Sequence, residues 1–458
     1  MVKLYFDCAR LSNGWARDVT VDVGADGRIA AVTADSAPDD ARRIGGACVP
    51  GMTNLHSHAF QWAFAGLAEV AGPAGDTFWT WRRRMYEFVA RFDPDMLQAV
   101  AARLYVEMLK AGYTAVGEFH YLHHGPDGRA YDDPAEMSER IVAAAAAAGI
   151  GLTLLPVLYA HNGFGGSAPA DGQRRFVHGP DGYVQLIETL VHRHAGDANV
   201  RIGVAPHSLR AVTPDLLSGV LERTRTIVPQ APIHIHIAEQ EKEVEDCLAW
   251  SGKRPVAWLM DHLPVDGRWC LVHATHLDGE EQATLAGSEA VAGLCPTTEA
   301  NLGDGVFPAV GHLRAGGRIG IGSDSHVCVD PAEELRLLEY GQRLLHRGRN
   351  MLAGGEGQST GAGLYTAAAR GGAQALGFEA GVIAPGKRAD LVVLDPEAMG
   401  PAPSPEDALL DRWIFSGPHR PVRHVFVAGR QVISDGRHGA DEATMADCRA
   451  ALARLSDR

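Results

Sequence analysis

The sequence predicts an α/β protein in which a repeated βα core lies between two β-rich ends. From about residue 50 to residue 375, short apolar runs alternate with amphipathic stretches of helical period, a pattern typical of repeated βα units. The first 50 residues and those after about residue 380 contain short β segments separated by turns. We therefore expect residues 1–49 and 380–458 to form one composite β-sandwich domain, beside a βα domain of residues 50–379.

Eight apolar runs account for the strands of the core. They cover residues 49–58, 113–119, 151–159, 201–207, 232–238, 269–275, 290–296 and 318–324. Eight strands that alternate with helices favour a closed (β/α)8 barrel, the TIM barrel, over an open sheet. The length of 458 residues accommodates such a barrel, which takes about 250 residues, together with a smaller second domain.

Four helices of the core have clear start signals. In each, Asp or Thr precedes Pro, so that a capping side chain occupies the N-cap and proline takes the first helical position, where its missing N–H costs nothing. These dipeptides begin at Asp93, Asp133, Thr213 and Asp330. Gly112 and Gly149 are expected to end the first two helices in the left-handed conformation.

Composition and charge limit the classes of function. The 46% hydrophobic and 21% charged residues are those of a globular chain and exclude intrinsic disorder. A net charge of −14 repels phosphate backbones and anionic lipids, so neither nucleic acid nor a membrane is an expected partner. Seven scattered cysteines without a C-x-x-C pair indicate a reducing compartment. With no signal-like segment and no apolar run of about 18 residues, we expect a cytoplasmic protein.

Potential metal ligands and proton-transfer groups recur where the candidate strands end. His56 and His58 are two residues apart, so both imidazoles point to one face of a strand and can share a metal. An H-x-H pair alone is a weak signal, but the other strand ends carry Glu118, His120, Tyr121, Tyr159, His161, His207, His236, Glu239, His273, His276, Thr297, Glu299 and Asp324. In a TIM barrel these ends converge on one face. Imidazole and carboxylate donors without thiolate suit a catalytic divalent zinc with an open position for water.

An ordered set of motifs resembles the amidohydrolase superfamily over essentially the whole chain. The motifs are VPGMTNLHSHAFQ, HIHIAEQ, LVHATHL, GIGSDSH and APGKRADLVVLD. The H-x-x-E on the fifth strand resembles the mononuclear aminohydrolases, which deaminate C=N centres. Binuclear members use a carboxylated lysine, and this sequence has Glu118 near the corresponding place. The resemblance therefore implies a hydrolase with one metal ion.

Carried over residue by residue, the resemblance implies one divalent metal, zinc or alternatively ferrous iron, held by His56, His58, His236 and Asp324. Glu239 and His273 would be the proton-transfer pair, with Asp324 also able to accept a proton from the water. His234 lies one layer deeper than His236 on the same strand face, and we expect it to be a buried structural histidine. His276 and His326 are expected beside the ligands rather than among them. The resemblance also implies a homodimer.

The polar residues around the strand ends indicate the substrate class. Arg210 follows the His207 strand end and could offer a bidentate fork to a carboxylate, although its position equally allows a surface arginine. Gln61, Tyr121 and His207 add hydrogen-bond donors. Arg82 adds another, although either of the two arginines that follow it could serve equally well. Such a set suits a small, flexible, anionic substrate better than a flat purine.

Four segments resemble one smaller group within the superfamily: HSHAFQ, GEFHYLHH, APHSLRAV and AEQEKEVEDC. They are most similar to superfamily members that convert N-formimino-L-glutamate and water into N-formyl-L-glutamate and ammonia in histidine degradation. That resemblance implies Gln61, Tyr121, His207 and Arg210 as substrate contacts.

Two other interpretations stay open. An aminohydrolase of a cyclic C=N compound, such as guanine, a pterin or an S-adenosylhomocysteine-like nucleoside, would need an aromatic stacking surface and fewer cationic contacts. A catalytically silent barrel could bind a small molecule at the same face. A binding protein, however, has no use for the proton-transfer pair Glu239 and His273.

Overall fold

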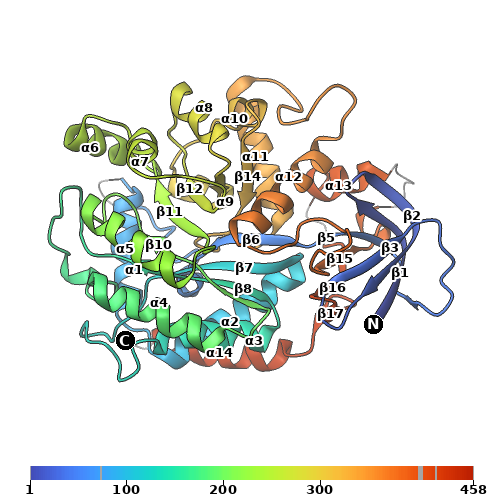
Figure 1. The fold of residues 1–458 in the computed structure, drawn as a ribbon, viewed down its shortest axis with the longest axis horizontal. Helices are drawn as coiled ribbons and strands as arrows, with labels where there is room; N and C mark the ends of the chain where they lie inside the picture. The colour runs from blue at the N-terminus through green and yellow to red at the C-terminus, as the bar shows by residue number, and fades with distance from the viewer. Residues whose placement is uncertain (1, 73–74, 401–405, 418–419, 457–458) are drawn as a thin grey trace.

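The computed structural model describes residues 2–72, 75–400, 406–417 and 420–456 and confirms the predicted α/β class (Figure 1). A barrel occupies one side of the molecule, and a β domain made from both ends of the chain lies beside it. The barrel strands are β6 (Met52–Ser57), β7 (Tyr113–His120), β8 (Gly151–Leu158), β9 (Val200–Ile202), β10 (Ala205–Pro206), β11 (Ile233–Ile237), β12 (Trp269–His273), β13 (Val291–Leu294) and β14 (Arg318–Ile321).

The predicted barrel closes through two seams. Strands β6, β7, β8 and β9–β10 form one parallel sheet, and β11 to β14 form another. The predicted strand 201–207 is divided into β9 and β10, which both pair with β8, so that the barrel has eight strand positions. An isolated parallel bridge between Ser57 and Asp324 joins β6 to the end of β14. A second, between Ser208 and His236, joins the β10 side to β11.

Helices surround the barrel and follow the predicted pattern with one correction. Asp93, Thr213 and Asp330 each accept a backbone N–H as N-caps, and Gly112 and Gly149 end their helices in the left-handed region. The helices are α1 (Phe78–Val89), α2 (Pro94–Ala111), α3 (Glu136–Ala148), α4 (Pro180–His194), α5 (Pro214–Ile227), α6 (Glu241–Ser251), α7 (Pro255–His262), α8 (Gly279–Gly287), α9 (Pro296–Leu302), α10 (Ala309–Arg314), α11 (Pro331–His346) and α12 (Thr360–Ala375).

The exception is α3, which begins two residues later than Asp133-Pro134 predicts. The Asp133 carboxylate accepts the N–H of Ala135, so that it closes a short turn before the helix instead of capping it. Short 3-10 turns occur at Ala59–Phe64, Asp171–Gln173 and Glu397–Met399. Within the described ranges, every helix is too short or too polar to cross a bilayer.

The two ends of the chain pair as predicted. Their strands are β1 (Val2–Leu11), β2 (Gly14–Val23), β3 (Ile29–Thr33), β4 (Arg42–Arg43), β5 (Ala47–Pro50), β15 (Leu391–Leu394), β16 (Val422–Val427), β17 (Arg430–Ser434) and β18 (Arg437–His438). Antiparallel pairing of β5 with β15, with Val49 opposite Val392, joins the two halves into one sheet. A separate apolar core that includes Phe6, Leu391 and Phe426 lies inside this domain.

Two helices that the sequence analysis missed lie in the C-terminal part assigned to the β domain. They are α13 (Glu406–Phe415) and α14 (Asp441–Ser456). Helix α14 lies along α2 of the barrel, and α13 packs on α12 (Figure 1). Arg103 of α2 forms an ion pair with Asp441 at the start of α14. We propose that residues 1–49 and 380–458 form the small domain and that residues 50–379 form the barrel. In this proposal the two helices attach the small domain to the barrel.

Glycines allow α12 to approach the barrel strands closely. A Cβ atom added at Gly371 would lie 2.0 Å from the carbonyl oxygen of Ile319 in β14. A Cβ atom at Gly372 would lie 2.1 Å from Oγ1 of Thr53 in β6. The backbone of α12 therefore contacts both strands whose ends meet at the β14–β6 seam.

This contact predicts a sharp difference between two alanine substitutions in one helix. Gly371→Ala should lower the free energy of unfolding by about 1–3 kcal/mol, because backbone must move to admit the methyl group. Gly363→Ala, at an exposed position with nothing within 4 Å, should be neutral or stabilising by up to about 1 kcal/mol. Urea unfolding followed by circular dichroism measures both. Equal stability of the two variants would contradict the close packing of α12.

Candidate active site

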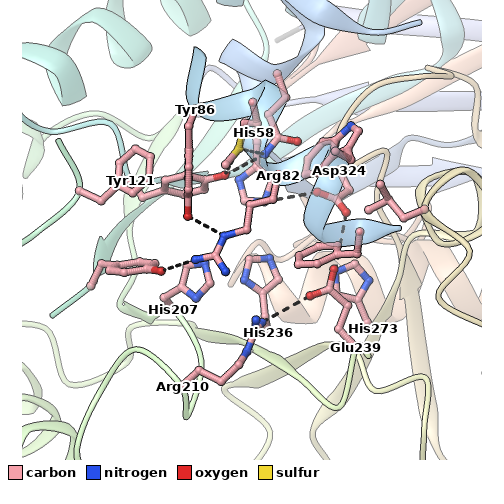
Figure 2. A pocket seen from close by; sticks show the side chains of 17 residues that line it. His58, Arg82, Tyr86, Tyr121, His207, Arg210, His236, Glu239, His273 and Asp324 are labelled. Carbon is pink, nitrogen blue, oxygen red and sulfur yellow. Dashed lines mark hydrogen bonds and ion pairs between the residues drawn. The ribbon is translucent and has the colours of Figure 1, made fainter. Parts of the chain in front are cut away.

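The barrel brings the predicted site residues together at the C-terminal ends of its strands. One pocket there is lined by His58, Gln61, Arg82, Tyr121, His207, Arg210, His236, Glu239, His273 and Asp324 (Figure 2). His56, the remaining predicted residue, lies directly behind this surface and contacts His58 and His236. Strand-end side chains that are far apart in sequence thus share one small space.

Three imidazoles and one carboxylate converge at the base of the pocket. Nε2 of His56 lies 3.2 Å from Nε2 of His58 and 3.0 Å from Nε2 of His236. Oδ1 of Asp324 lies 3.3 Å from Nε2 of His58 and 3.7 Å from Nε2 of His56. All four side chains are buried. Ligand atoms of His56, His58 and Asp324 lie within 4.8 Å of one another, and so do those of His56, His236 and His273, so His56 belongs to both groups.

The chemistry of these donors fits a divalent metal. Nδ1 of His58 donates a hydrogen bond of 2.9 Å to the carbonyl oxygen of Phe119, which leaves the lone pair on Nε2 facing the other donors. Burial lowers the pKa of His58 to about 3, so the ring is neutral and can act as a ligand. Nitrogen and carboxylate donors in this number suit zinc and also ferrous iron.

Glu118 supports the segment that carries His58. Its carboxylate accepts hydrogen bonds from the Ala59 N–H at 2.7 Å, the Ser57 hydroxyl at 2.5 Å and the Tyr105 hydroxyl at 3.0 Å. Burial raises the pKa of Glu118 to about 7. Glu118, which the sequence predicted as a potential ligand or proton-transfer group, therefore fixes the loop after β6.

Glu239, His273 and Asp324 form an adjoining group. Nε2 of His273 lies 3.8 Å from Oε1 of Glu239 and 3.7 Å from Oδ2 of Asp324. Burial acts to lower the pKa of His273, but the neighbouring carboxylates, Glu239 foremost, raise it to about 10. Burial raises the pKa of Asp324 to about 7. The backbones of His273 and Asp324 have φ of 68° and 47°, a strained conformation of the kind that clusters at functional sites.

Helix α1 covers the pocket and decides which arginine enters it. Arg82 donates hydrogen bonds to the Tyr86 hydroxyl at 2.5 Å and to the Tyr159 hydroxyl at 2.9 Å, and its side chain extends into the pocket (Figure 2). Arg83 and Arg84 are exposed and line a separate outer groove. The structure thus separates the three adjacent arginines, which the sequence left equivalent.

Arg210 reaches the pocket from below His207 and His236 in Figure 2, whereas Arg82 enters from above. Its Nη2 is 3.6 Å from Oε2 of Glu239 and 3.7 Å from Oε2 of Glu243. The side chain is only 12% exposed, so the alternative of a surface arginine is wrong. A buried cation facing the pocket is suited to bind an anionic group.

Gln61, Tyr121 and His207 complete the wall of the pocket. Nε2 of Gln61 donates to the Tyr121 hydroxyl at 2.8 Å. Oε1 of Gln61 is buried and has no hydrogen-bond partner among the described residues. His207 packs edge-on against Tyr159 with ring centroids 4.6 Å apart. These side chains therefore present polar atoms that a ligand could satisfy.

Other histidines lie where the sequence analysis expected them. His234 is buried below the site, where its Nε2 donates to the carbonyl oxygen of Ala375 at 2.7 Å. His326 contacts the hydroxyls of Ser57 and Ser323, beside the converging donors. His276 is partly exposed and is not among the residues that line the pocket.

Helix α1 presents a whole face to the pocket, of which the sequence predicted only Arg82. The residues of this face follow the helical spacing i, i+3, i+4, i+7 and i+8, and they are Phe78, Trp81, Arg82, Met85 and Tyr86. That spacing was the available signal. Buried Glu243 was also missed, although it stands one helical turn after Glu239; buried Glu299 was predicted only as one of the potential ligand or proton-transfer groups at strand ends.

Comparison with known proteins gives the family. The model of the "Amidohydrolase family" matches residues 47–432. The chain belongs to the amidohydrolase family. This amidohydrolase also matches the model "Formimidoylglutamate deiminase HutF, N-terminal domain" over residues 6–46. The predicted superfamily is thereby confirmed.

Two curated relatives of this amidohydrolase are a deiminase and a deaminase. It is 56% identical over 442 residues to a formimidoylglutamate deiminase of Pseudomonas aeruginosa, covering 96% of this chain and 97% of that one. It is 28% identical over 424 residues to a 5-methylthioadenosine/S-adenosylhomocysteine deaminase of Natronomonas pharaonis, covering 91% and 89% of the two chains.

Solved structures show the same fold. An amidohydrolase from Brucella melitensis superposes with a TM-score of 0.93 at 49% identity, covering 99% of this chain and all of that one. An adenosine deaminase from Xanthomonas campestris, described with bound zinc, superposes with a TM-score of 0.81 at 22% identity, covering 99% and 98%. The second likeness concerns the fold alone. The amidohydrolase barrel with a terminal β domain is therefore shared by these proteins.

Proposed function

We propose that this amidohydrolase hydrolyses N-formimino-L-glutamate to N-formyl-L-glutamate and ammonia, a reaction of histidine degradation. The observation that carries the proposal is 56% identity, over nearly the whole of both chains, to a formimidoylglutamate deiminase. Two arginines directed to one pocket, Arg82 and Arg210, support a substrate with carboxylates. The enzyme is a hydrolase that acts on a linear amidine C–N bond.

We propose that one divalent ion per chain is held by His56, His58, His236 and Asp324. Their converging Nε2 and Oδ atoms support this assignment, and zinc is the expected metal, with ferrous iron as the alternative. When bound, such an ion polarises a water molecule and lowers its pKa toward 7.

The protein side chains would handle the protons of the reaction. Addition of water to the amidine carbon forms a C–O bond, and Glu239 is placed to give a proton to the imino nitrogen. Asp324 is placed to accept the protons that the water loses, and His273, whose Nε2 faces both Glu239 and Asp324, is placed to exchange a proton with these carboxylates. A further proton on that nitrogen lets the C–N bond break, so that ammonia leaves as the new carbonyl group forms.

Substrate binding would use the cations and hydroxyls of the pocket wall. In this proposal Arg210 binds one carboxylate of the glutamate moiety, and Arg82 supplies a second positive charge from α1. Gln61, Tyr121 and His207 would contact the rest of the substrate. All three line the pocket, and the buried Oε1 of Gln61, which lacks a partner among the described residues, supports this role.

A cyclic substrate is the competing proposal, because deaminases of ring compounds are among the more distant relatives. The two arginines of the pocket favour the anionic linear substrate. Ammonia release by the metal-loaded protein from N-formimino-L-glutamate, guanine, a pterin and S-adenosylhomocysteine separates the two. Turnover of a ring compound alone would overturn the proposal, and turnover of none would favour a silent binding barrel.

We further propose that the enzyme is a cytoplasmic homodimer. The superfamily resemblance supports the dimer, and the acidic composition with scattered cysteines supports the compartment. Sedimentation equilibrium should give twice the 48.8 kDa mass of the chain. A monomer at micromolar concentration would contradict this assignment.

The metal assignment predicts that metal and activity are lost together. His56→Ala and Asp324→Ala should each remove the bound ion and abolish ammonia release, while circular dichroism shows a folded barrel, since the large apolar core does not depend on the ion. Elemental analysis should give one equivalent in the wild type. His346→Ala, on the exposed end of α11, is the control. Two equivalents per active chain, or activity after complete chelation, would contradict the proposal.

The acid–base assignment predicts a loss of turnover without loss of metal in Glu239→Gln. The amide keeps the shape of the side chain but cannot deliver a proton, so kcat should fall roughly 10² to 10⁴-fold. Glu241→Gln, an exposed position at the start of α6, should leave kcat unchanged. Near wild-type turnover in Glu239→Gln would rule out this residue as the acid.

The substrate assignment predicts a selective loss in Arg210→Met. An unpaired carboxylate in a desolvated pocket should cost about 2–5 kcal/mol of transition-state binding. That cost corresponds to roughly 30-fold to several-thousand-fold in kcat/KM. Arg210→Lys should rescue only partly, because a point charge does not reproduce the planar fork.

The Arg210 experiment has two controls: a substrate that lacks the carboxylate and a substitution of an arginine outside the pocket. A formimino compound without the carboxylate should be affected much less by Arg210→Met, and Arg83→Met on the outer face of α1 should leave both substrates unaffected. Equal losses on the two compounds would mean that Arg210 supports the fold or the metal site.

A further inference from the structure

A carboxylate outside the described reaction scheme contacts the rear nitrogen of His273. Glu299 lies on α9, the helix that follows β13, and its side chain is buried. Its Oε1 accepts a hydrogen bond of 3.2 Å from Nδ1 of His273 and one of 2.8 Å from the backbone N–H of Cys295. The backbone bond ties the carboxylate to the start of its own helix.

This contact decides which nitrogen of His273 faces the reaction. A carboxylate is an acceptor, so Nδ1 of His273 keeps its hydrogen whether the ring is neutral or cationic. Nε2 is the nitrogen that faces Glu239 and Asp324. Proton exchange by His273 is therefore confined to Nε2, on the side of the ring that faces the pocket.

The bond to Glu299 and the backbone conformation together set the orientation of the His273 ring. His273 has φ of 68°, and the next residue, Ala274, has φ of 47°. The imidazole lies nearly parallel to that of His236, with centroids 5.5 Å apart and planes at 11°. The bond to Glu299 holds the ring from the side opposite Asp324, so it fixes the direction in which Nε2 points.

We propose that Glu299 is the positioning residue of His273: it holds the hydrogen on Nδ1 and thereby keeps Nε2 available for proton transfer. This inference rests on the proposed function, in which His273 exchanges protons with the reacting groups. Glu299 itself does not line the pocket.

The alternative role of His273 and Glu299, together with Cys295, is a second metal site. One ligand atom each of His273, Cys295 and Glu299 lie within 4.8 Å of one another. Two observations disfavour it. Burial raises the pKa of the Cys295 thiol well above its usual range, so the thiol keeps its proton. Oε1 of Glu299 already accepts two N–H groups.

The first test is Glu299→Gln in the metal-loaded enzyme. Its amide oxygen can still accept the Cys295 N–H, which preserves the start of α9, but the negative charge beside Nδ1 is removed. We expect kcat for ammonia release to fall roughly 10² to 10⁴-fold, with KM changed by less than about threefold. Metal content should stay at the wild-type value. Loss of one metal equivalent would instead assign the cluster as a metal site.

Glu334→Gln is the matched control. Glu334 is also a fully buried carboxylate, and it binds the same helix through the N–H and hydroxyl of Thr297, at 2.9 and 2.6 Å. It is not a partner of His273 in the part of the chain that the structure describes. Its substitution should affect thermal stability but leave kcat within about threefold. A similar fall of kcat in both variants would overturn the proposal in favour of a structural role of α9.

A double-substitution cycle separates positioning from a structural effect. If Glu299 acts through His273, adding Glu299→Gln to His273→Ala should lower kcat by less than about threefold beyond the single variant. A full additional loss would show that Glu299 acts independently of His273, and would overturn the proposal.

A measurement without substrate distinguishes failure of this inference from failure of the proposed function. In protein labelled with ¹⁵N-histidine, the ring signals that His273→Ala removes should show a hydrogen on Nδ1, and Glu299→Gln should shift or broaden that signal. Inactivity of the wild type on N-formimino-L-glutamate, with this signature present, would overturn the function and leave the contact intact. An unprotonated Nδ1 in the wild type would overturn the inference itself.

Discussion

Closure of the barrel between β14 and β6 is the constraint on which the site depends. At this seam the N–H of Asp324 donates to the carbonyl oxygen of His56 at 3.0 Å, and the N–H of His58 donates to that of Asp324 at 3.1 Å. Residues more than 260 positions apart in sequence are thereby held in register, and their side chains converge. The side chain of Asn54 reinforces the seam through Ser323. Because α12 packs on both strands through glycine, the same seam is supported from outside the barrel.

Buried carboxylates fix the loops that leave the strands. Each accepts a backbone N–H near a strand end, and the pairs are Glu118 with Ala59, Glu243 with Glu239, and Glu299 with Cys295. An ionised group in such surroundings is costly unless hydrogen bonds compensate it, so each position is closely specified. Side chains after β6, β11 and β13 consequently have little freedom, which is what a site that handles protons requires.

The environment gives similar residue types different tasks. Arg82 and Arg210 come from α1 and from the segment after β10, and both reach the pocket, whereas Arg83 and Arg84 remain in solvent. Among the histidines, His58 donates its Nδ1 hydrogen to a backbone carbonyl, and His273 donates its own to a carboxylate. The bond to a carbonyl favours a neutral His58 that can bind a metal. The bond to a carboxylate favours a His273 ring that can carry a proton. Helix α1 adds the apolar side chains of Phe78, Trp81 and Met85 to the lining of the pocket.

The sequence by itself determined the strand runs, three of the four helix starts with Asp or Thr before Pro, and the set of strand-end residues, because each depends on side chains a few positions apart. Apolar periodicity and N-cap chemistry act locally, and the barrel topology then brings the strand ends together. Only the tertiary structure decided which arginine of α1 enters the pocket, that Arg210 is buried, and that Glu118 supports a loop. It also placed α13 and α14 on the barrel and Glu299 behind His273. Those outcomes depend on contacts between segments distant in sequence, and no local pattern of residues encodes the orientation of one element against another.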